Sequence, residues 1–483
     1  MMEEVPDEIL SKIISFLSVK EAIGTSILSK RWRNQYLFMS RLNFDADTFI
    51  SSGSKRTDFC YKVERVMSVY KLLQHYLESS EIESFRLWIP YHWPYFVELV
   101  KFRASNMWKG VEEVNFTHRD HHRGRIFSLE FLSALRPSKL KHLRLQSCSI
   151  APAALPEPKP KPVLHSLAIL ELEDGLVDQT ALETIFSTCV NLGKLVLRKC
   201  KFPPNLTIAD GPPSLSCLQI LSPMHLEKLQ ISSLPNLTYF EFQYIDEDED
   251  KEREGLGLGV YPKPKPKPCF SNVPKLEEMR LDLVDHDMFI TTDAPPQLKR
   301  LITSIFHTSM SMPSILDPKS SDPPQIPVIS RAILCQLEQL ELVLDIKYCN
   351  LLTMIPHVLL ACPLLQKFHL TASGSPSKIP FVACPSPSKH SSFPNLKQVK
   401  IRTFYGRCGN PFVFYLLENA VALERIILDT TSCPCPPDLC KLKHMSHQVP
   451  NHQIRAKVAS PTANLLLQHH SNQGIHFAKI FMR

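Results

Sequence analysis

The sequence has very little glycine. Only 14 of its 483 residues are glycine, and neither GxGxxG nor GxxxxGK followed by Ser or Thr occurs in it. Such glycine loops let the backbone approach the phosphates of a nucleotide, so the sequence predicts no nucleotide site. The motifs HExxH, GxSxG and CxxC are missing as well. We therefore expect no catalytic residue, no bound metal and no cofactor, and a protein that is not an enzyme.

Strong charge and long apolar runs are also lacking. The net charge of +7 comes from 55 basic and 48 acidic residues spread along the chain, which is too mild an excess to indicate a nucleic-acid partner. The most apolar stretch, residues 351–365, is broken by Pro356, His357 and Pro363 and is shorter than the roughly 20 residues that span a bilayer. We expect no membrane segment.

The sequence does contain 14 cysteines, without a hydrophobic signal segment. This combination is typical of reduced thiols in the nucleus or the cytoplasm. Hydrophobic residues make up 44% of the chain and charged residues 21%, which allows a sizeable core. At about 150 residues per domain, the length predicts several domains or one repeat array.

The stretch EVPDEILSKIISFLSVKEAIGTSILSKRWR, near the start of the chain, predicts three short helices. Pro6 suits the first helical position, and two acidic residues follow it in the positive first turn. Ser18 and Glu21 match a capping box for the second helix, and Ser29 is a candidate cap for the third.

The first of these helices is apolar over more than one face. Its apolar residues cover more than the roughly 100° stripe that a surface helix needs; they are Ile9, Leu10, Ile13, Ile14, Phe16 and Leu17. A module of about 40 residues cannot bury so much apolar surface alone. Either the rest of the chain or another protein must cover part of it.

The same residues resemble a known module. VPDEILSKIISFL followed by VKEAIGTSILSKRWR is similar to the F-box of plant F-box/leucine-rich-repeat (FBD-like) proteins, over about thirty positions in register. The resemblance implies docking on a Skp-type adaptor, and through it on a cullin. It assigns that contact to Val5, Pro6, Ile9, Leu10, Ile13, Leu17, Leu28 and Trp32.

The body of the chain repeats the pattern L-x-x-L-x-L. Most matches start roughly 20 to 30 residues apart, which is the period of leucine-rich repeats; they begin at Ile82, Val111, Leu140, Leu167, Leu192, Leu215, Leu226, Leu237, Leu276, Leu298, Leu337, Leu365, Leu396 and Leu423. Three repeats share an upstream apolar stretch that ends in Cys189, Cys362 or Ala420, which indicates a helix feeding a strand. These cysteines are expected in the core.

The expected fold is therefore α/β: a short three-helix F-box followed by an irregular leucine-rich-repeat solenoid of parallel strands, with helices on the convex side. We expect the F-box at 1–45, a helical linker at 46–80 and the repeats at 81–430. A tail follows at 431–483, and the sequence pattern predicts no particular structure for it. Three insertions rich in Pro, Lys, Ser or acidic residues read as exposed loops within the repeats; they span 156–162, 246–268 and 310–328.

The outward positions of the repeat strands are the candidate face for a protein substrate, because such arrays present an extended binding surface. Basic residues prevail in the candidate set, which suggests an acidic partner segment; the candidates are Arg144, Lys194, Arg198, Lys228, Tyr239, Arg280, Lys367, Lys400, Arg402 and Arg425. For each single residue, plain solvation is the simpler interpretation.

Two functions remain open at this point. One is a substrate receptor of a Skp-cullin-F-box ubiquitin ligase, with or without a small molecule that completes the target interface. The other is a leucine-rich-repeat scaffold whose N-terminal helices fold back on the array and engage no ligase. The best metal candidate is a group of thiols and imidazoles at Cys433, Cys435, Cys440, His444 and His447, whose irregular spacing favours a loop with free thiols instead.

Overall fold

The computed structural model describes the chain in segments. They are residues 5–45, 82–89, 110–118, 125–127, 139–150, 164–244, 266–283, 295–305, 335–345, 355, 358–373, 392–402, 406–429, 460, 464–471 and 474–480. The chain forms two compact units, one of residues 1–237 and 257–268 and one of residues 238–256 and 269–483. The linker expected at 46–80 and the insertions at 156–162 and 310–328 lie outside the described residues.

The chain begins with a helical module. It contains α1 (Asp7–Ile14), α2 (Val19–Gly24) and two 3-10 helices, η2 (Thr25–Ile27) and η3 (Trp32–Phe38). Pro6 precedes α1 instead of starting it, because its extended ψ of 149° leaves only its carbonyl to accept the first helical bonds, from the N–H groups of Ile9 and Leu10. The first helix therefore starts at Asp7, one residue later than expected.

The capping box at α2 is confirmed. The Ser18 N–H donates to Oε2 of Glu21 at 2.9 Å, and the Glu21 N–H donates to the Ser18 hydroxyl at 3.3 Å. The Ser29 hydroxyl accepts the Trp32 N–H at 3.4 Å, at the start of η3. These bonds satisfy backbone donors that have no partner within a helix, so they fix where the second and third helices begin.

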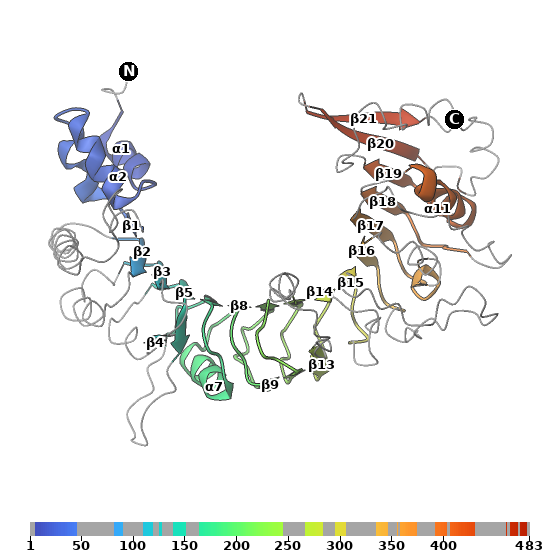
Figure 1. The fold of residues 1–483 in the computed structure, drawn as a ribbon, viewed down its shortest axis with the longest axis horizontal. Helices are drawn as coiled ribbons and strands as arrows, with labels where there is room; N and C mark the ends of the chain where they lie inside the picture. The colour runs from blue at the N-terminus through green and yellow to red at the C-terminus, as the bar shows by residue number, and fades with distance from the viewer. Residues whose placement is uncertain are drawn as a thin grey trace, which may run out of the picture. The chain divides into compact units, whose positions relative to one another are not determined.

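A parallel sheet follows in the first unit, with strands in chain order (Figure 1). Each strand pairs in parallel with the next; they are β1 (Arg41–Phe44), β2 (Ser84–Ile89), β3 (Glu113–His118), β5 (His142–Gln146), β7 (Ile169–Glu173), β8 (Lys194–Arg198) and β10 (Cys217–Leu221). A short parallel pair, β4 (Arg125–Phe127) and β6 (Cys148–Ile150), lies apart from it. β1 starts the sheet within the range expected for the F-box.

The second unit repeats this order. Its parallel strands are β12 (Tyr239–Gln243), β14 (Glu278–Leu283), β15 (Arg300–Ile305), β16 (Gln339–Asp345), β17 (Lys367–Ser373), β18 (Gln398–Arg402), β19 (Arg425–Asp429) and β20 (Asn464–Ser471). β21 (Gly474–Ile480) closes this order as an antiparallel strand. The sheet thus continues into the segment expected as a tail.

The motif leucines form the core, because alternate residues of a strand point to opposite faces. In β5 the buried residues are Leu143 and Leu145, while those between them are half-buried. The strands of successive repeats align these positions, so Leu143 lies opposite Leu170 of β7 and Leu170 opposite Leu195 of β8. The α/β solenoid expected from the sequence is confirmed.

Tight turns end several strands of the first unit. The residue that follows the strand has a positive φ after β5, β7, β8 and β10, at Ser147 (56°), Asp174 (54°), Lys199 (50°) and Ser222 (52°). The Ser147 hydroxyl also donates to Asp174 at 2.9 Å, which links two successive turns. The same turn at each repeat keeps the strands in parallel register.

Within the described segments, the connections between repeat strands are of two kinds, helices and short strands. Among the described residues, α7 (Gln179–Thr188) and α11 (Gly406–Asn419) are the long helices of the array. In the first unit, two repeats carry strands instead, β9 (Asn205–Ile208) and β11 (Lys228–Ser232), which pair with each other. These repeats are short and contain paired prolines, Pro203-Pro204 and Pro212-Pro213, which leaves little room for a helix. One division between the two units falls within β13 (Lys267–Ser271), after residue 268.

Candidate functional site

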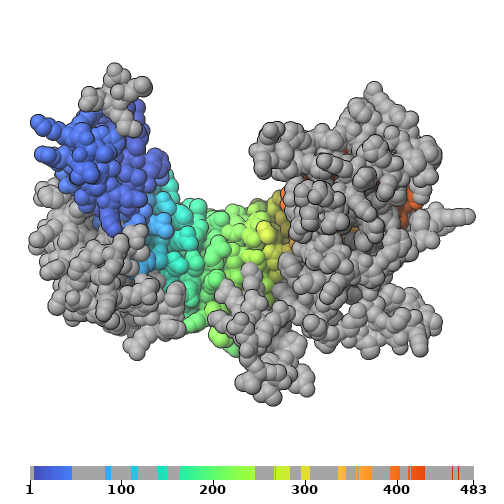
Figure 2. All heavy atoms as spheres, turned by 45° about the horizontal axis from the view of Figure 1, so that its top comes forward, coloured from blue at the N-terminus to red at the C-terminus, as the bar shows by residue number. Residues whose placement is uncertain are grey.

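Exposed apolar side chains gather on the helical module. Seven of the twelve large apolar residues that are exposed in the described part of the chain lie there; they are Ile9, Ile13, Phe16, Ile23, Ile27, Leu28 and Phe38. The module, blue in Figure 2, is small, so this apolar surface is large for its size. A surface of this kind is typical of a protein-interaction site.

The residues expected to contact an adaptor divide into two groups. Ile9 and Ile13 are 50% and 48% exposed, Leu28 is 64% exposed, and Pro6 is exposed as well. Val5, Leu17 and Trp32 are half-buried. Leu10 is only 2% exposed and packs inside the module, so it supports α1 instead of offering a surface.

Four exposed apolar residues are missing from the expected set. Phe16, Ile23, Ile27 and Phe38 are each exposed by more than a third, and Phe16 also packs under Arg41, whose guanidinium lies 5.6 Å from its ring centroid. Phe16 extends the row of Ile9 and Ile13 by the helical spacing of three to four residues. That spacing is the sequence signal that identifies it. Ile23 and Ile27 also lie four residues apart, whereas Phe38 has no such neighbour.

Arg31 ties the third-helix region to the start of α1. Its Nε and Nη2 atoms donate to Oδ1 of Asp7 at 2.9 and 2.7 Å, and Nη2 also donates to the Val5 carbonyl. Further along α1, the Ser11 hydroxyl donates to the Phe38 carbonyl at 2.5 Å, and the Ser40 N–H donates to the Ser15 hydroxyl at 3.1 Å. These bonds hold the exposed apolar residues in one arrangement.

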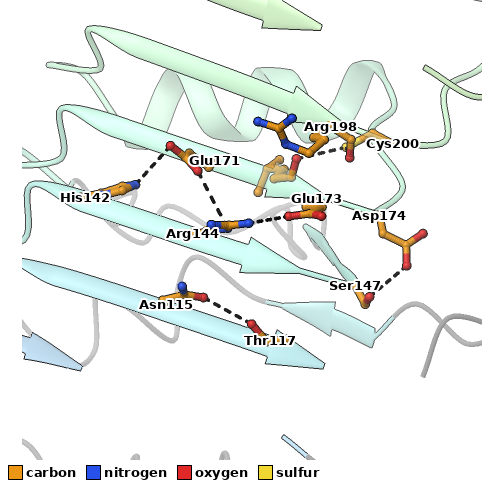
Figure 3. A network of polar contacts seen from close by, with 11 residues as sticks. Asn115, Thr117, His142, Arg144, Ser147, Glu171, Glu173, Asp174, Arg198 and Cys200 are labelled. Carbon is orange, nitrogen blue, oxygen red and sulfur yellow. Dashed lines mark hydrogen bonds and ion pairs between the residues drawn. The ribbon is translucent and has the colours of Figure 1, made fainter. Parts of the chain in front are cut away.

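The second candidate surface is the outward face of the repeat strands. In the first unit it carries a network in which charges alternate across neighbouring strands (Figure 3). Arg144 of β5 reaches Glu173 of β7 at 2.7 Å and lies 3.9 Å from Glu171, and His142 Nε2 lies 3.5 Å from Glu171. The second nitrogen of His142 lies 3.9 Å from Glu113 of β3.

This network changes the acidity of Glu171. The contact with His142 is the main cause of its lowered pKa, and Arg144 and Lys194 add attraction, while burial acts against them. The carboxylate is therefore favoured in its charged form. Arg144 is thus neutralised by Glu171 and Glu173 of the neighbouring strand. Neither glutamate was among the candidates predicted from the sequence.

A similar neutralisation occurs in the second unit. Arg280 of β14 lies 3.5 Å from Glu241 and 3.3 Å from Asp282, and Arg300 of β15 lies 2.9 Å from Glu278. Tyr239 of β12 donates its hydroxyl to Glu241 at 2.9 Å, and burial together with this bond raises the pKa of the phenol. Arg280 and Tyr239 therefore already have partners within the protein.

The remaining basic candidates lie elsewhere. Lys194 is half-buried and Arg198 exposed on β8, and Lys367, Lys400, Arg402 and Arg425 lie on β17, β18 and β19. Lys228 does not share the face: it lies on β11, which pairs with β9 outside the main sheet. Lys228 entered the candidate set because it lies in the motif that begins at Leu226. This motif follows the Leu215 motif by only half a repeat, a spacing that suits the return strand of a short repeat.

The cysteines of the repeats serve the core. Cys189, Cys200 and Cys362 are buried, and burial raises the pKa of each thiol to about 12. Among the described residues, no group of three or more His, Cys, Asp and Glu side chains could hold a metal. The candidate group at 433–447 lies outside them. No helix within the described segments is long and apolar enough to cross a membrane.

The fold and these two surfaces define a class: a small helical module with an apolar surface, followed by a leucine-rich-repeat array. Comparison with known families agrees with it. The F-box domain model matches residues 2–35, and the model of the At1g61320/AtMIF1 LRR domain matches residues 97–250. The chain thus carries an F-box followed by leucine-rich repeats.

Its relatives are plant proteins whose names also combine an F-box with leucine-rich repeats. It is 29% identical over 251 residues to the F-box/LRR-repeat protein At3g58980 of Arabidopsis thaliana, a match that covers 50% of this chain and 39% of that protein. It is 26% identical to the F-box/LRR-repeat protein At1g55660, over 57% of this chain and 72% of that protein, and 24% identical to the putative F-box/FBD/LRR-repeat protein At4g00315, over 64% and 65%, both from the same plant. The resemblance to plant F-box/leucine-rich-repeat proteins is confirmed, although the chain spans less than half the length of the first of these relatives.

Proposed function

We propose that this protein is the substrate-recognition subunit of a Skp-cullin-F-box ubiquitin ligase. The F-box docks on a Skp-type adaptor, which connects it to a cullin, and the repeat face holds the protein to be ubiquitinated. The receptor itself carries out no chemistry. By holding the target, it raises the effective concentration of the target's lysines near the ubiquitin carrier, and this proximity is its contribution to the reaction.

The observation that carries this proposal is the exposed row on α1. Ile9 and Ile13 lie one helical turn apart and are each about half exposed, while Leu10 and Ile14 on the other side of the helix are buried. The helix is therefore anchored by one face and free on the other. A scaffold whose N-terminal helices fold back on the array would cover this row, and the exposure of Ile9 and Ile13 argues for an external partner.

The experiment is co-purification of the full chain with a Skp-type adaptor. The test variant is Ile9→Asp/Ile13→Asp, which charges the exposed row without touching the buried Leu10. The matched control is Leu360→Asp/Val421→Asp, because these residues are 43% and 50% exposed but lie far along the sequence from the F-box. Circular dichroism of each variant reports whether it is folded.

The proposal requires that the intact chain and the control variant bind the adaptor and that the test variant does not. If a folded intact chain fails to bind, the scaffold function replaces the receptor. If the test variant binds as well as the intact chain, the adaptor uses another surface.

We further propose residence in the nucleus, the cytoplasm or both, where thiols stay reduced, which fits the free cysteines of the described segments. A fluorescent fusion of the full chain tests it. Fluorescence confined to a secretory compartment would contradict both the location and the ligase function.

A further inference from the structure

Four basic side chains on β17, β18 and β19 differ from the other cations of the strand face. We call them the basic patch: Lys367, Lys400, Arg402 and Arg425. The three strands are paired in parallel and adjacent (Figure 1), and Lys367, Gln398 and Arg425 share one register position across them. Lys400 and Arg402 occupy the next two outward positions of β18.

The basic patch points away from the core. The alternate residues of β18, Val399 and Ile401, are 1% and 4% exposed, while Lys400 is half-buried and Arg402 exposed. In β19 Ile426 and Leu428 are buried and Arg425 is exposed. Because neighbouring strands lie about 4.8 Å apart and alternate residues about 6.6 Å apart along a strand, the four cations share an area about 10 Å wide.

The patch differs from the other arginines of the strand face in its ion pairs, although Arg402 lies near enough to Glu341 to help lower the pKa of that carboxyl. Arg144, Arg280 and Arg300 each lie within 3.3 Å of a carboxylate. In the part of the chain that the structure describes, none of the four patch side chains forms such an ion pair. The three strands together contain a single acidic residue, Asp429, which is 5% exposed.

We propose that the basic patch binds an acidic segment of the target protein, one rich in Asp and Glu. Carboxylates spaced along an extended segment would meet the cations of successive strands and supply the charges that this part of the sheet lacks. Asp429, in register with Arg402, and Glu341 of β16, in register with His369, border the patch. The four cations cover only three adjacent strands, which suits a short acidic segment of a protein better than a long phosphate backbone.

This inference rests on the proposed function in one respect: it takes the acidic segment to belong to the protein that the receptor holds for ubiquitination. The binding itself needs no adaptor. The two can therefore fail separately: loss of adaptor binding in Ile9→Asp/Ile13→Asp leaves acidic binding intact, and loss of acidic binding leaves adaptor binding intact.

The test begins with selection of peptides from a random dodecamer display library on the immobilised full chain. The expected result is enrichment of Asp and Glu among the recovered peptides. The best of these is then labelled, and its binding to the full chain is measured by fluorescence anisotropy. A second peptide, with Asn and Gln in place of Asp and Glu, shows the contribution of charge.

Variants of the chain locate the binding site. Lys400→Glu/Arg425→Glu should weaken acidic-peptide binding about tenfold or more, since like charges oppose the peptide. Lys400→Gln/Arg425→Gln should weaken it less, and it serves as the second variant if the reversal affects folding. The matched control is Lys201→Glu/Lys228→Glu, which makes the same change of charge at two exposed lysines outside the main sheet and should bind as the unmodified chain does.

Three results would overturn the inference. If the recovered peptides carry no acidic excess, the patch has no such preference. The folded reversal variant could bind the acidic peptide as tightly as the control does, which places the binding elsewhere. A single-stranded oligonucleotide of equal charge that displaces the peptide at equal or lower concentration would make the surface a nucleic-acid site.

Discussion

Ile9 and Leu10 are neighbours on α1, yet one is 50% exposed and the other 2% exposed. Leu10 fixes the helix to the module, whereas Ile9 is left at the surface. The same division separates Ile13 from Ile14, which is fully buried. Stability and the proposed adaptor contact therefore depend on different residues of one short helix and can be tested separately.

Replacing Leu10 should destabilise the module. Leu10→Ala removes a buried side chain and leaves a cavity, which costs about 2–5 kcal/mol. Ile9→Ala should change the free energy of unfolding by only about 0.5 kcal/mol because the side chain is half exposed. Hydrogen exchange of peptides that cover α1 measures both. Equal protection in the two variants would contradict the placement of Leu10 in the core.

The capping box should contribute measurably to α2. Ser18→Ala removes the hydroxyl that accepts the Glu21 N–H, and loss of such a cap costs about 1 kcal/mol. We expect faster hydrogen exchange in residues 19–24 and a lower unfolding temperature. Ser26→Ala, the same substitution in the same module, is the control. A Ser18→Ala variant that exchanges like the control would show that the cap does not hold the helix.

The contact of His142 with Glu171 should make stability depend on pH. The folded pKa of Glu171 lies below its ordinary value of 4.5, so the fold favours the charged carboxylate. This stabilisation is present above the unfolded pKa and is lost as the pH falls through the lower folded pKa.

The variant Glu171→Gln should therefore unfold at a lower temperature than the unmodified chain at pH 7. The difference should shrink as the pH falls below about 4.5. Thermal unfolding between pH 7 and pH 3 measures it, and His142→Gln should reduce the same pH dependence. A difference that stays constant over this range would assign the effect to packing.

The buried thiols should be unreactive. Burial raises the pKa of Cys189, Cys200 and Cys362 to about 12, so at neutral pH they carry almost no thiolate, which is the nucleophilic form. Alkylation of the native chain, followed by mass spectrometry, should label the exposed Cys269 before these three. After denaturation all four should react. Early native labelling of Cys200 would mean that its repeat opens.

The sequence was sufficient to predict most of the array. The buried leucines of L-x-x-L-x-L determine where a strand lies, and each match other than Leu226 precedes a strand of the main sheet. β1 was missed because its motif begins with Met39, whereas every detected match begins with Leu, Ile or Val. β20 was missed because no apolar residue precedes it at the required spacing, and its place depends on pairing with β19.

The candidate face was predictable only in part, because its electrostatics depend on register. Arg144 meets Glu171 and Glu173, which lie a full repeat away in sequence and come next to it only through the pairing of β5 with β7. A count of basic residues cannot identify such pairs. It also cannot show that Lys400 and Arg425 form no ion pair with the residues that the structure describes.

The central claim is that the exposed row of α1 binds a Skp-type adaptor. Isothermal titration of the adaptor into the full chain tests it most directly, at several temperatures. The account predicts saturable binding with a negative change in heat capacity, because apolar surface is buried, and loss of that binding in Ile9→Asp/Ile13→Asp. No binding by the folded unmodified chain, or equal binding by the folded variant, would contradict it.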